Sequence, residues 1–193
     1  MVVGWQKARM ELATKGQLRW AFLRWAVVTV PLIILLGFAS SRVAPSGGQS
    51  RWYAELAKPA LNPPDWVFPV AWTLLYILLG LALAMILNAR GARYRGLAIA
   101  LFAAQMVANL VWTPLFFGAH QVALAFALIV VIFVLALITT IVFGRIRAAA
   151  AWLMVPYLAW LCFAGALNFG IMDLNPNAAT LVPSSSSAQM DIH

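Results

Sequence analysis

The residues of this chain best suited to chemistry are neutral amides and indoles placed inside long apolar stretches. Gln105, Asn109 and Trp112 recur at spacings of four and three, which puts them on one face of a helix. Amides and indoles supply hydrogen-bonding groups and flat stacking surfaces, which suit the binding of a flat apolar molecule. Amides also form hydrogen bonds between membrane helices, and the sequence leaves both roles open for Gln105 and Asn109.

Two further apolar stretches carry aromatic side chains at helical spacing. Trp72 and Tyr76 are four residues apart in the first. The second has residues spaced by three and four, namely Tyr157, Trp160, Ala164 and Leu167, with Asn168 beside the last. Tryptophan near a membrane end usually anchors a helix at the interface, but Trp160 lies well inside its stretch. We therefore expect Trp72, Trp112 and Trp160 to line one binding site.

The same stretches contain no group suited to acid–base or ion-coupled chemistry. Residues 67–87, 97–117, 122–143 and 152–172 each run 21 or 22 residues without Asp, Glu, Lys, Arg or His. Pumps and ion-coupled carriers usually hold a charged side chain inside the bundle, so these classes are disfavoured. Cys162 is the single cysteine, which excludes a cysteine metal cluster. We expect no acid–base catalytic residue, no metal site and no obligatory cofactor.

Apolar runs of this length predict helices that cross a membrane, because about 20 helical residues span the hydrocarbon core. A fifth, weaker run extends from Trp25 to Ser41, and a cleaved secretory signal is its alternative interpretation. We predict an all-α integral membrane protein whose single domain, residues 24–176, is a five-helix bundle. The expected helices lie near residues 24–43, 67–87, 97–117, 121–143 and 151–172. A basic cytoplasmic extension, residues 1–23, and a disordered tail, residues 177–193, flank the domain.

Composition and charge agree with a membrane protein. Hydrophobic residues make up 64% of the chain and charged residues 9%, which excludes a soluble globular protein. The net charge of +8 does not indicate nucleic-acid binding, because the basic residues gather beside the ends of the spans. Ten fall on one side: Lys7, Arg9, Lys15, Arg19, Arg24, Arg90, Arg93, Arg95, Arg145 and Arg147. The positive-inside rule then places the N-terminus in the cytoplasm and the C-terminus outside, in what we expect to be a bacterial cell membrane.

The connection between the first two spans, residues 51–69, is the most unusual segment outside the apolar runs. Pro59, Pro63 and Pro64 fall within six residues and stiffen the backbone. Its aromatic side chains, which include Trp52, supply apolar surface that water disfavours. We interpret this segment as a lid over the outer mouth of the bundle. The alternative is an interfacial segment that lies on lipid headgroups.

Five groups of motifs follow one another between residues 51 and 176. They are Trp52-Tyr53 with Lys58-Pro59 and Asn62-Pro63-Pro64, then Trp66-Val67-Phe68-Pro69, then Ala71-Trp72-Thr73 with Leu75-Tyr76, then Gln105 and Asn109 with Trp112-Thr113-Pro114-Leu115-Phe116-Phe117, and last Pro156-Tyr157-Leu158-Ala159-Trp160 with Leu167-Asn168. In this order on a chain with five spans, they resemble the TspO/translocator protein family. Members of that family are also called tryptophan-rich sensory proteins and peripheral benzodiazepine receptors.

The resemblance implies a dimeric five-helix bundle with a pocket on the lid side for porphyrin, haem or other tetrapyrroles. In some members it implies sterols and isoquinoline or benzodiazepine drugs as ligands. The family's ligand-binding positions fall here on Tyr53, Pro63, Trp72, Asn109, Trp112, Trp160, Ala164 and Leu167. We expect binding to serve sensing, buffering or transport. The small-residue stripe of Ala100, Ala104 and Ala108 is a candidate face for a homodimer.

Two other function classes stay open. One is an enzyme that degrades porphyrin in light and oxygen, with Trp72 and Trp160 taking part in radical chemistry. The other is an assembly protein whose lid and alanine stripe contact partner proteins. The chain also departs from the family in two places: Ala60 and Leu61 replace an aromatic pair of the lid, and Phe169 replaces the tyrosine of a proposed sterol pattern. Sterol binding is therefore the least supported family property.

Overall fold

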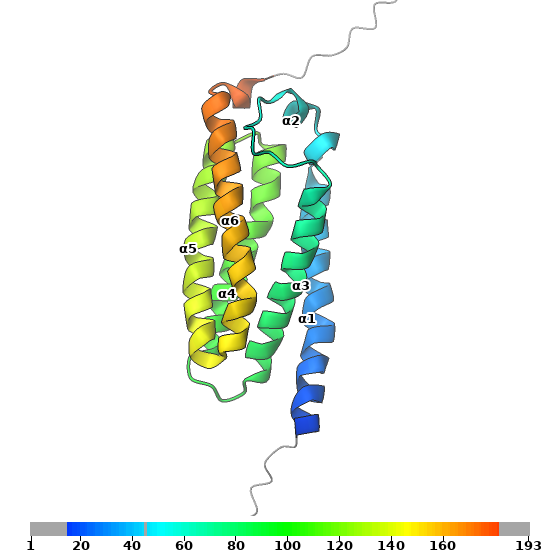
Figure 1. Ribbon diagram of the computed structural model, residues 1–193, viewed down its shortest axis with the longest axis vertical. Helices are drawn as coiled ribbons and strands as arrows, with labels where there is room; N and C mark the ends of the chain where they lie inside the picture. Colours follow the sequence, from blue (N-terminus) through cyan, green and yellow to red (C-terminus); the bar gives the residue numbers. More distant parts are fainter. Residues whose placement is uncertain (1–14, 45, 182–193) are drawn as a thin grey trace, which may run out of the picture.

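The long apolar runs form helices because a helix satisfies its own backbone hydrogen bonds, which lipid cannot do. The computed structural model describes residues 15–44 and 46–181, and no strand occurs among them. Five helices in this part are long and apolar enough to cross a membrane (Figure 1). They are α1 (Lys15–Val43), α3 (Val67–Asn88), α4 (Arg95–Thr113), α5 (Val122–Ile146) and α6 (Ala148–Leu174). The prediction of an all-α five-helix membrane bundle is confirmed.

Several helix ends differ from the expected ones. α1 begins at Lys15 rather than near residue 24, while residues 1–14 of the expected extension lie outside the described residues. α4 ends at Thr113, and a short π-helix, η2 (Pro114–Gly118), follows it directly. Within the expected tail, a 3-10 helix, η3 (Ala178–Thr180), follows α6. The rest of that tail, residues 182–193, lies outside the described residues.

Neighbouring helices pack antiparallel, and α3 connects α1 to the group of α4, α5 and α6. α1 lies against α3, α3 lies against α6, and α5 packs on both α4 and α6. The α1–α3 contact is close because Gly80 has no side chain: a methyl group there would lie 2.7 Å from Val30 Cα. At the same level, the Thr29 hydroxyl donates a hydrogen bond to the Gly80 carbonyl at 2.8 Å. This contact holds α1 to the bundle near its middle.

The lid, residues 51–69, closes one end of the bundle. It follows the 3-10 helix η1 (Gly47–Gln49) and begins with a short helix, α2 (Arg51–Glu55), whose N-terminus is capped by the Ser50 side chain. Trp52 is only 2% exposed, and its Nε1 donates to the Ala178 carbonyl at 2.8 Å. Asn175 at the end of α6 makes two further bonds, accepting from Ala57 N at 2.9 Å and donating to Ala57 O at 2.8 Å. These three bonds fasten the lid to the C-terminal end of α6 and to η3, which follows it.

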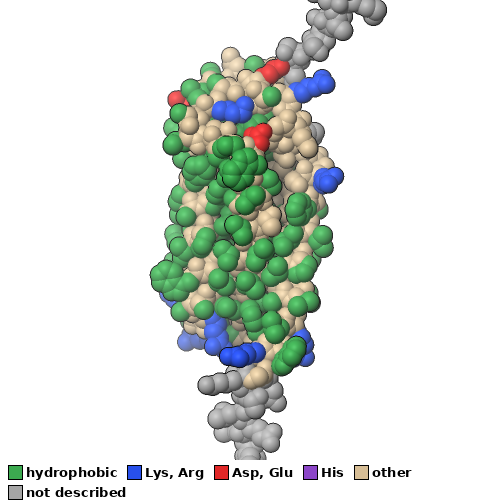
Figure 2. Space-filling view, turned by 45° about the vertical axis from the view of Figure 1, so that its right-hand side comes forward, with side chains coloured by type: hydrophobic (Ala, Val, Ile, Leu, Met, Phe, Trp, Pro, Cys, Tyr) green, Lys and Arg blue, Asp and Glu red, His purple; other side chains and the backbone are tan. Residues whose placement is uncertain are grey.

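The two ends of the bundle differ in charge. The acidic side chains of the described residues, Glu55, Asp65 and Asp173, lie at or beside the lid. Basic side chains crowd the opposite end of the face in Figure 2. There the Arg95 guanidinium donates to the Ile86 and Leu87 carbonyls at 3.2 and 2.9 Å, which satisfies the C-terminal end of α3. We call this the basic end, and its assignment to the cytoplasm stays a prediction.

Candidate functional site

An amide on α4 connects three helices in the middle of the bundle. The Tyr76 hydroxyl donates to Asn109 Oδ1 at 3.2 Å, and Asn109 Nδ2 donates to the Tyr157 hydroxyl at 3.1 Å. Asn109 is 6% exposed and Tyr157 is fully buried. Hydrogen bonds of this kind hold membrane helices in one register. Asn109 therefore has a structural role, and its remaining lone pair and N–H leave it free to orient a ligand as well.

Trp72 and Trp160 meet beside this network, as the sequence predicts. Their ring centroids are 6.2 Å apart, with the ring planes at 80°, which is an edge-to-face contact. Trp72 also contacts the rings of Tyr76 at 5.3 Å and Tyr157 at 6.4 Å, and Phe68 contacts Trp160 at 6.1 Å. We call this group the aromatic site: Phe68, Trp72, Tyr76, Asn109, Tyr157 and Trp160.

Trp112 belongs to a second group of rings, directly beneath the lid. Its ring stacks on Phe116 at 5.0 Å and 15°, and Phe117 lies 6.0 Å away at a steep angle. Tyr53 of the lid contacts the same two phenylalanines, at 6.2 and 5.4 Å. We call this group the cap cluster: Trp52, Tyr53, Trp112, Phe116 and Phe117. Because Trp112 also packs against the bundle core, it connects the cap cluster to the aromatic site.

Four side chains of the described residues have buried polar atoms without a hydrogen-bond partner. They are Trp112 and Trp160 at Nε1, and Gln105 and Asn168 at both side-chain polar atoms. Gln105 is fully buried and Asn168 is 2% exposed. Leaving a buried polar group unpaired costs about 1–3 kcal/mol, so these groups favour binding of a molecule that offers partners. The two indoles offer N–H donors next to packed rings.

The remaining predicted positions lie in less defined surroundings. The Tyr53 hydroxyl donates to Asn62 Oδ1 at 3.2 Å, and Asn62 Nδ2 donates to the Pro63 carbonyl at 3.3 Å. Tyr53 and Pro63 therefore both take part in the fold of the lid. Leu167 is buried and Ala164 is half-buried on α6. A ligand-binding role for Pro63, Ala164 and Leu167 stays a prediction.

The structure adds residues that the predicted site does not include. Tyr76 and Tyr157 share the Asn109 network; in the sequence they are marked by their helical spacing to tryptophans and by their place in the family motifs. His120, in the turn between η2 and α5, stacks on Trp52 with centroids 4.3 Å apart and planes at 14°. No signal in the sequence indicates that contact, because the two residues lie far apart along the chain.

The aromatic site and the cap cluster are packed, ring against ring, rather than open. Neighbouring centroids in the two groups are 4.9 to 6.4 Å apart. Two surface clefts lie elsewhere, one of about 440 Å³ at the basic end and one of about 340 Å³ beside Pro69 and Leu74. A flat ligand would therefore enter by displacing the lid or by rotating rings, rather than by filling an existing hollow.

The fold and the site define a class: a multi-pass membrane protein with a neutral, tryptophan-rich site beneath a fastened lid. Comparison with known proteins identifies the family, since residues 18–174 match the TspO/MBR family, and the chain belongs to it. The chain is 39% identical over 148 residues to the tryptophan-rich protein TspO of Chlorobaculum tepidum, a match that covers 76% of this chain and 93% of that protein.

Two other relatives extend the comparison. The tryptophan-rich sensory protein of Cereibacter sphaeroides is 44% identical over 126 residues, which covers 65% of this chain and 78% of the relative. The human translocator protein is 34% identical over 134 residues, which covers 68% of this chain and 79% of the relative. The family resemblance seen in the sequence is confirmed.

Proposed function

We propose that this protein binds a tetrapyrrole such as a porphyrin, or another flat hydrophobic ligand, between α3, α4 and α6 beneath the lid, for sensing, buffering or transport. The observation that carries the proposal is the pair of buried indole N–H groups, at Trp112 and Trp160, which lie beside packed aromatic rings and have no hydrogen-bond partner among the described residues. A macrocycle with acceptor groups on its edge would satisfy these donors while its faces stack on the rings.

Burial of the ligand's apolar faces supplies most of the expected affinity. Each square ångström of apolar surface removed from water contributes roughly 25 cal/mol, so a large flat ring system binds strongly even without charged partners. Neutral donors suit this place because an unpaired charge would be costly in lipid. Asn109, held between Tyr76 and Tyr157, would orient the polar edge of the ligand.

Quenching of tryptophan fluorescence by protoporphyrin in detergent tests this proposal. Trp160→Ala should weaken binding roughly tenfold or more, because it removes a stacking surface worth about 1–3 kcal/mol. Trp152→Ala is the matched control, since Trp152 lies on the same helix but is 73% exposed. Equal affinities for the wild type and both variants would remove the aromatic site from the proposal.

The contact between Trp72 and Trp160 favours a second candidate, light-driven oxidation of the bound porphyrin. Two indoles at 6.2 Å beside the ligand could share an unpaired electron during such a reaction. Any reactivity would come from the photoexcited ligand and oxygen, because the aromatic site contains no carboxylate, histidine or lysine. Porphyrin absorbance under illumination should fall faster with the wild type than with Trp72→Phe; equal bleaching with and without protein would exclude catalysis.

We also propose that α4 forms the homodimer contact. Ala100 and Ala104 are exposed, and Val107 on the neighbouring surface is 62% exposed, so a second helix can approach closely. Ala104→Phe should shift the detergent-solubilised protein toward monomer in light scattering. Ala166→Phe, at an exposed position of α6, is the control; an unchanged mass for Ala104→Phe would place the dimer contact elsewhere.

A further inference from the structure

A cleft of about 440 Å³ opens between α1 and α3 at the basic end, far from the aromatic site. It is lined by Ala21, Arg24, Trp25, Val28, Asn88 and Arg90. Nearer the middle, the two helices are held together where Thr29 bonds to Gly80. The cleft begins beyond that contact, where α1 continues past the end of α3 (Figure 1).

The cleft is positively charged, and the protein does not neutralise it within the described residues. Arg24 comes from α1 and Arg90 from the turn after α3, and neither guanidinium group makes a hydrogen bond or an ion pair in the described part of the chain. The carboxylates of that part belong to the lid end. Arg95 nearby is different, because its guanidinium already caps α3.

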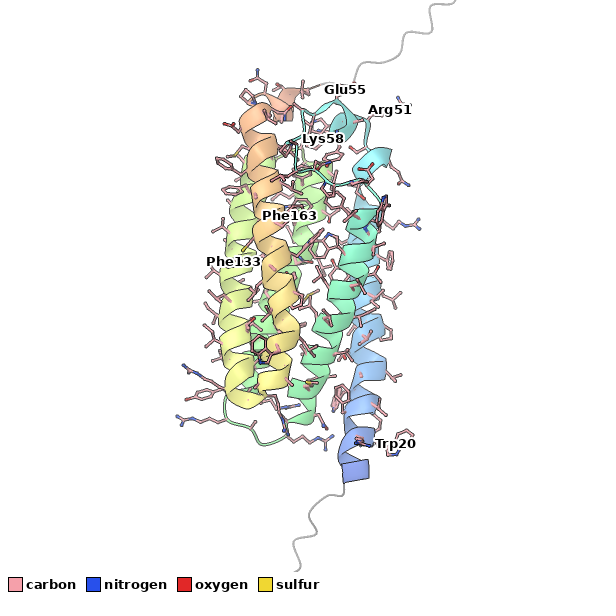
Figure 3. All side chains as sticks on the ribbon, viewed as in Figure 1. Trp20, Arg51, Glu55, Lys58, Phe133 and Phe163 are labelled. Atoms are coloured by element: carbon pink, nitrogen blue, oxygen red, sulfur yellow. The ribbon has the colours of Figure 1, made fainter. Side chains whose placement is uncertain are left out.

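The apolar side of the cleft continues into a surface suited to acyl chains. Trp25 and Val28 line the cleft, and the outward face of α1 exposes Val27 at 71% and Leu35 at 65% toward the lipid. Trp20, 70% exposed, projects from the foot of α1, at the opposite end from the lid residues labelled in Figure 3. Exposed indoles and guanidinium groups mark the level of the headgroups.

We propose that this cleft binds the headgroup phosphate of an anionic phospholipid from the leaflet at the basic end. Arg24 and Arg90 would hold the phosphate by charge-assisted hydrogen bonds, and the Asn88 amide would bond the glycerol portion. Trp25 would pack on the upper part of the acyl chains. A lipid rather than free phosphate is favoured because the charged cleft and the acyl-facing surface of α1 are continuous.

Native mass spectrometry of the full chain, released from nanodiscs of equal parts phosphatidylglycerol and phosphatidylcholine, tests this site. The wild type should retain phosphatidylglycerol, and Arg24→Gln/Arg90→Gln should retain it roughly thirtyfold less, because the two arginines near an anionic surface together contribute on the order of 2 kcal/mol. Arg145→Gln/Arg147→Gln is the matched control: it removes the same charge from the α5–α6 turn, outside the cleft.

Three results would overturn the proposal. Equal loss of phosphatidylglycerol in both double variants would show general attraction to a basic surface. Equal retention of the two lipids by the wild type would show no recognition of charge. Displacement of the bound lipid by millimolar glycerol phosphate would identify a soluble phosphate compound, rather than a lipid, as the occupant of the cleft. Thermal unfolding of each variant in detergent separates these outcomes from loss of the fold.

Discussion

The lid end and the basic end of the bundle differ in the kind of polar group that they contain and in how those groups are paired. Toward the lid, neutral side chains are packed and buried, as in the bond from Tyr76 to Asn109. Toward the basic end, Arg24 and Arg90 flank an open cleft without protein partners among the described residues. A charge costs much free energy in hydrocarbon and little at the headgroups, so a site for a charged ligand is favoured at the surface and a site for an uncharged ligand is favoured inside.

Gly80 lies between these regions, and its substitution should have the largest effect. A methyl group on Gly80 would lie 2.7 Å from Val30 Cα, which is backbone and cannot move aside. Gly80→Ala should therefore separate α1 from α3 and destabilise the protein by about 1–3 kcal/mol, the usual cost of overpacking. The measurement is thermal or SDS-induced unfolding in detergent.

Gly144→Ala is the control for that substitution. A methyl group on Gly144 would meet Ala151 Cβ at 3.5 Å, an ordinary contact, so this change should be neutral or slightly stabilising. Should both substitutions destabilise equally, the close approach at Gly80 would not be what holds α1 to the bundle.

The second prediction compares two amides on the same face of α4. Asn109→Ala removes both hydrogen bonds of the network and leaves the fully buried Tyr157 hydroxyl unpaired. We expect a loss of about 1–2 kcal/mol, because hydrogen bonds between membrane helices average about 0.6 kcal/mol and reach about 1.7. Gln105→Met should be neutral or stabilising, since both polar atoms of Gln105 are buried without a partner in the described residues.

The stabilities of the two variants test whether Asn109, rather than Gln105, holds α4 to its neighbouring helices. SDS titration measures the free energy of unfolding of each variant, and intrinsic tryptophan fluorescence reports changes in aromatic packing. If Gln105→Met loses as much stability as Asn109→Ala, Gln105 has a hydrogen-bond partner in the folded protein, and its amide is not an unpaired group that a ligand could satisfy.

Much of the fold could be predicted from the sequence, because the length and apolarity of a run decide whether it spans a membrane. The residues that share a face of α3 or α6 could also be predicted, because helical spacing fixes which side chains lie on the same face. Trp72 and Trp160 do meet. The sequence could not give their partners across helices: the bond from Asn109 to Tyr157 depends on how α4 and α6 pack, and no local signal encodes that.

The helix ends and the place of Trp112 were also beyond local signals. α4 gives way to a π-helix at Pro114, whose missing N–H changes the hydrogen-bond register. That change brings Phe116 and Phe117 beneath the lid, where Phe116 stacks on Trp112. Trp112 therefore joins the cap cluster instead of facing Trp160 directly, a result that spacing along a regular helix would not predict.

The third prediction concerns the fastening of the lid. Asn175→Ala removes both bonds to Ala57, and a net contribution of about 1 kcal/mol should be lost. The bundle should stay folded while the lid opens several times more often, so hydrogen exchange should rise in residues 51–62 and not in α5. On the proposed route of entry by displacement of the lid, porphyrin should also associate and dissociate faster.

Asn177→Ala provides the comparison for the lid, since its side chain lies two residues further along and makes no hydrogen bond among the described residues. Unchanged exchange in Asn175→Ala, or an equal rise in both variants, would show that the lid is held by its apolar packing alone.

The smallest expected effect belongs to Lys58. Its Nζ lies 4.6 Å from the centre of the Tyr53 ring and 3.4 Å from each of two carbonyl oxygens, those of Ala54 and Leu56. Lys58 is half-buried at the surface of the lid, where a cation–π contact contributes roughly 0.5–1 kcal/mol. Lys58→Met keeps the apolar stem and removes the charge, so lid exchange should rise less than in Asn175→Ala. Since exchange in the same peptides is measured for both variants, a larger rise for Lys58→Met would make the charge of the lid, rather than the bonds from α6, its main fastening.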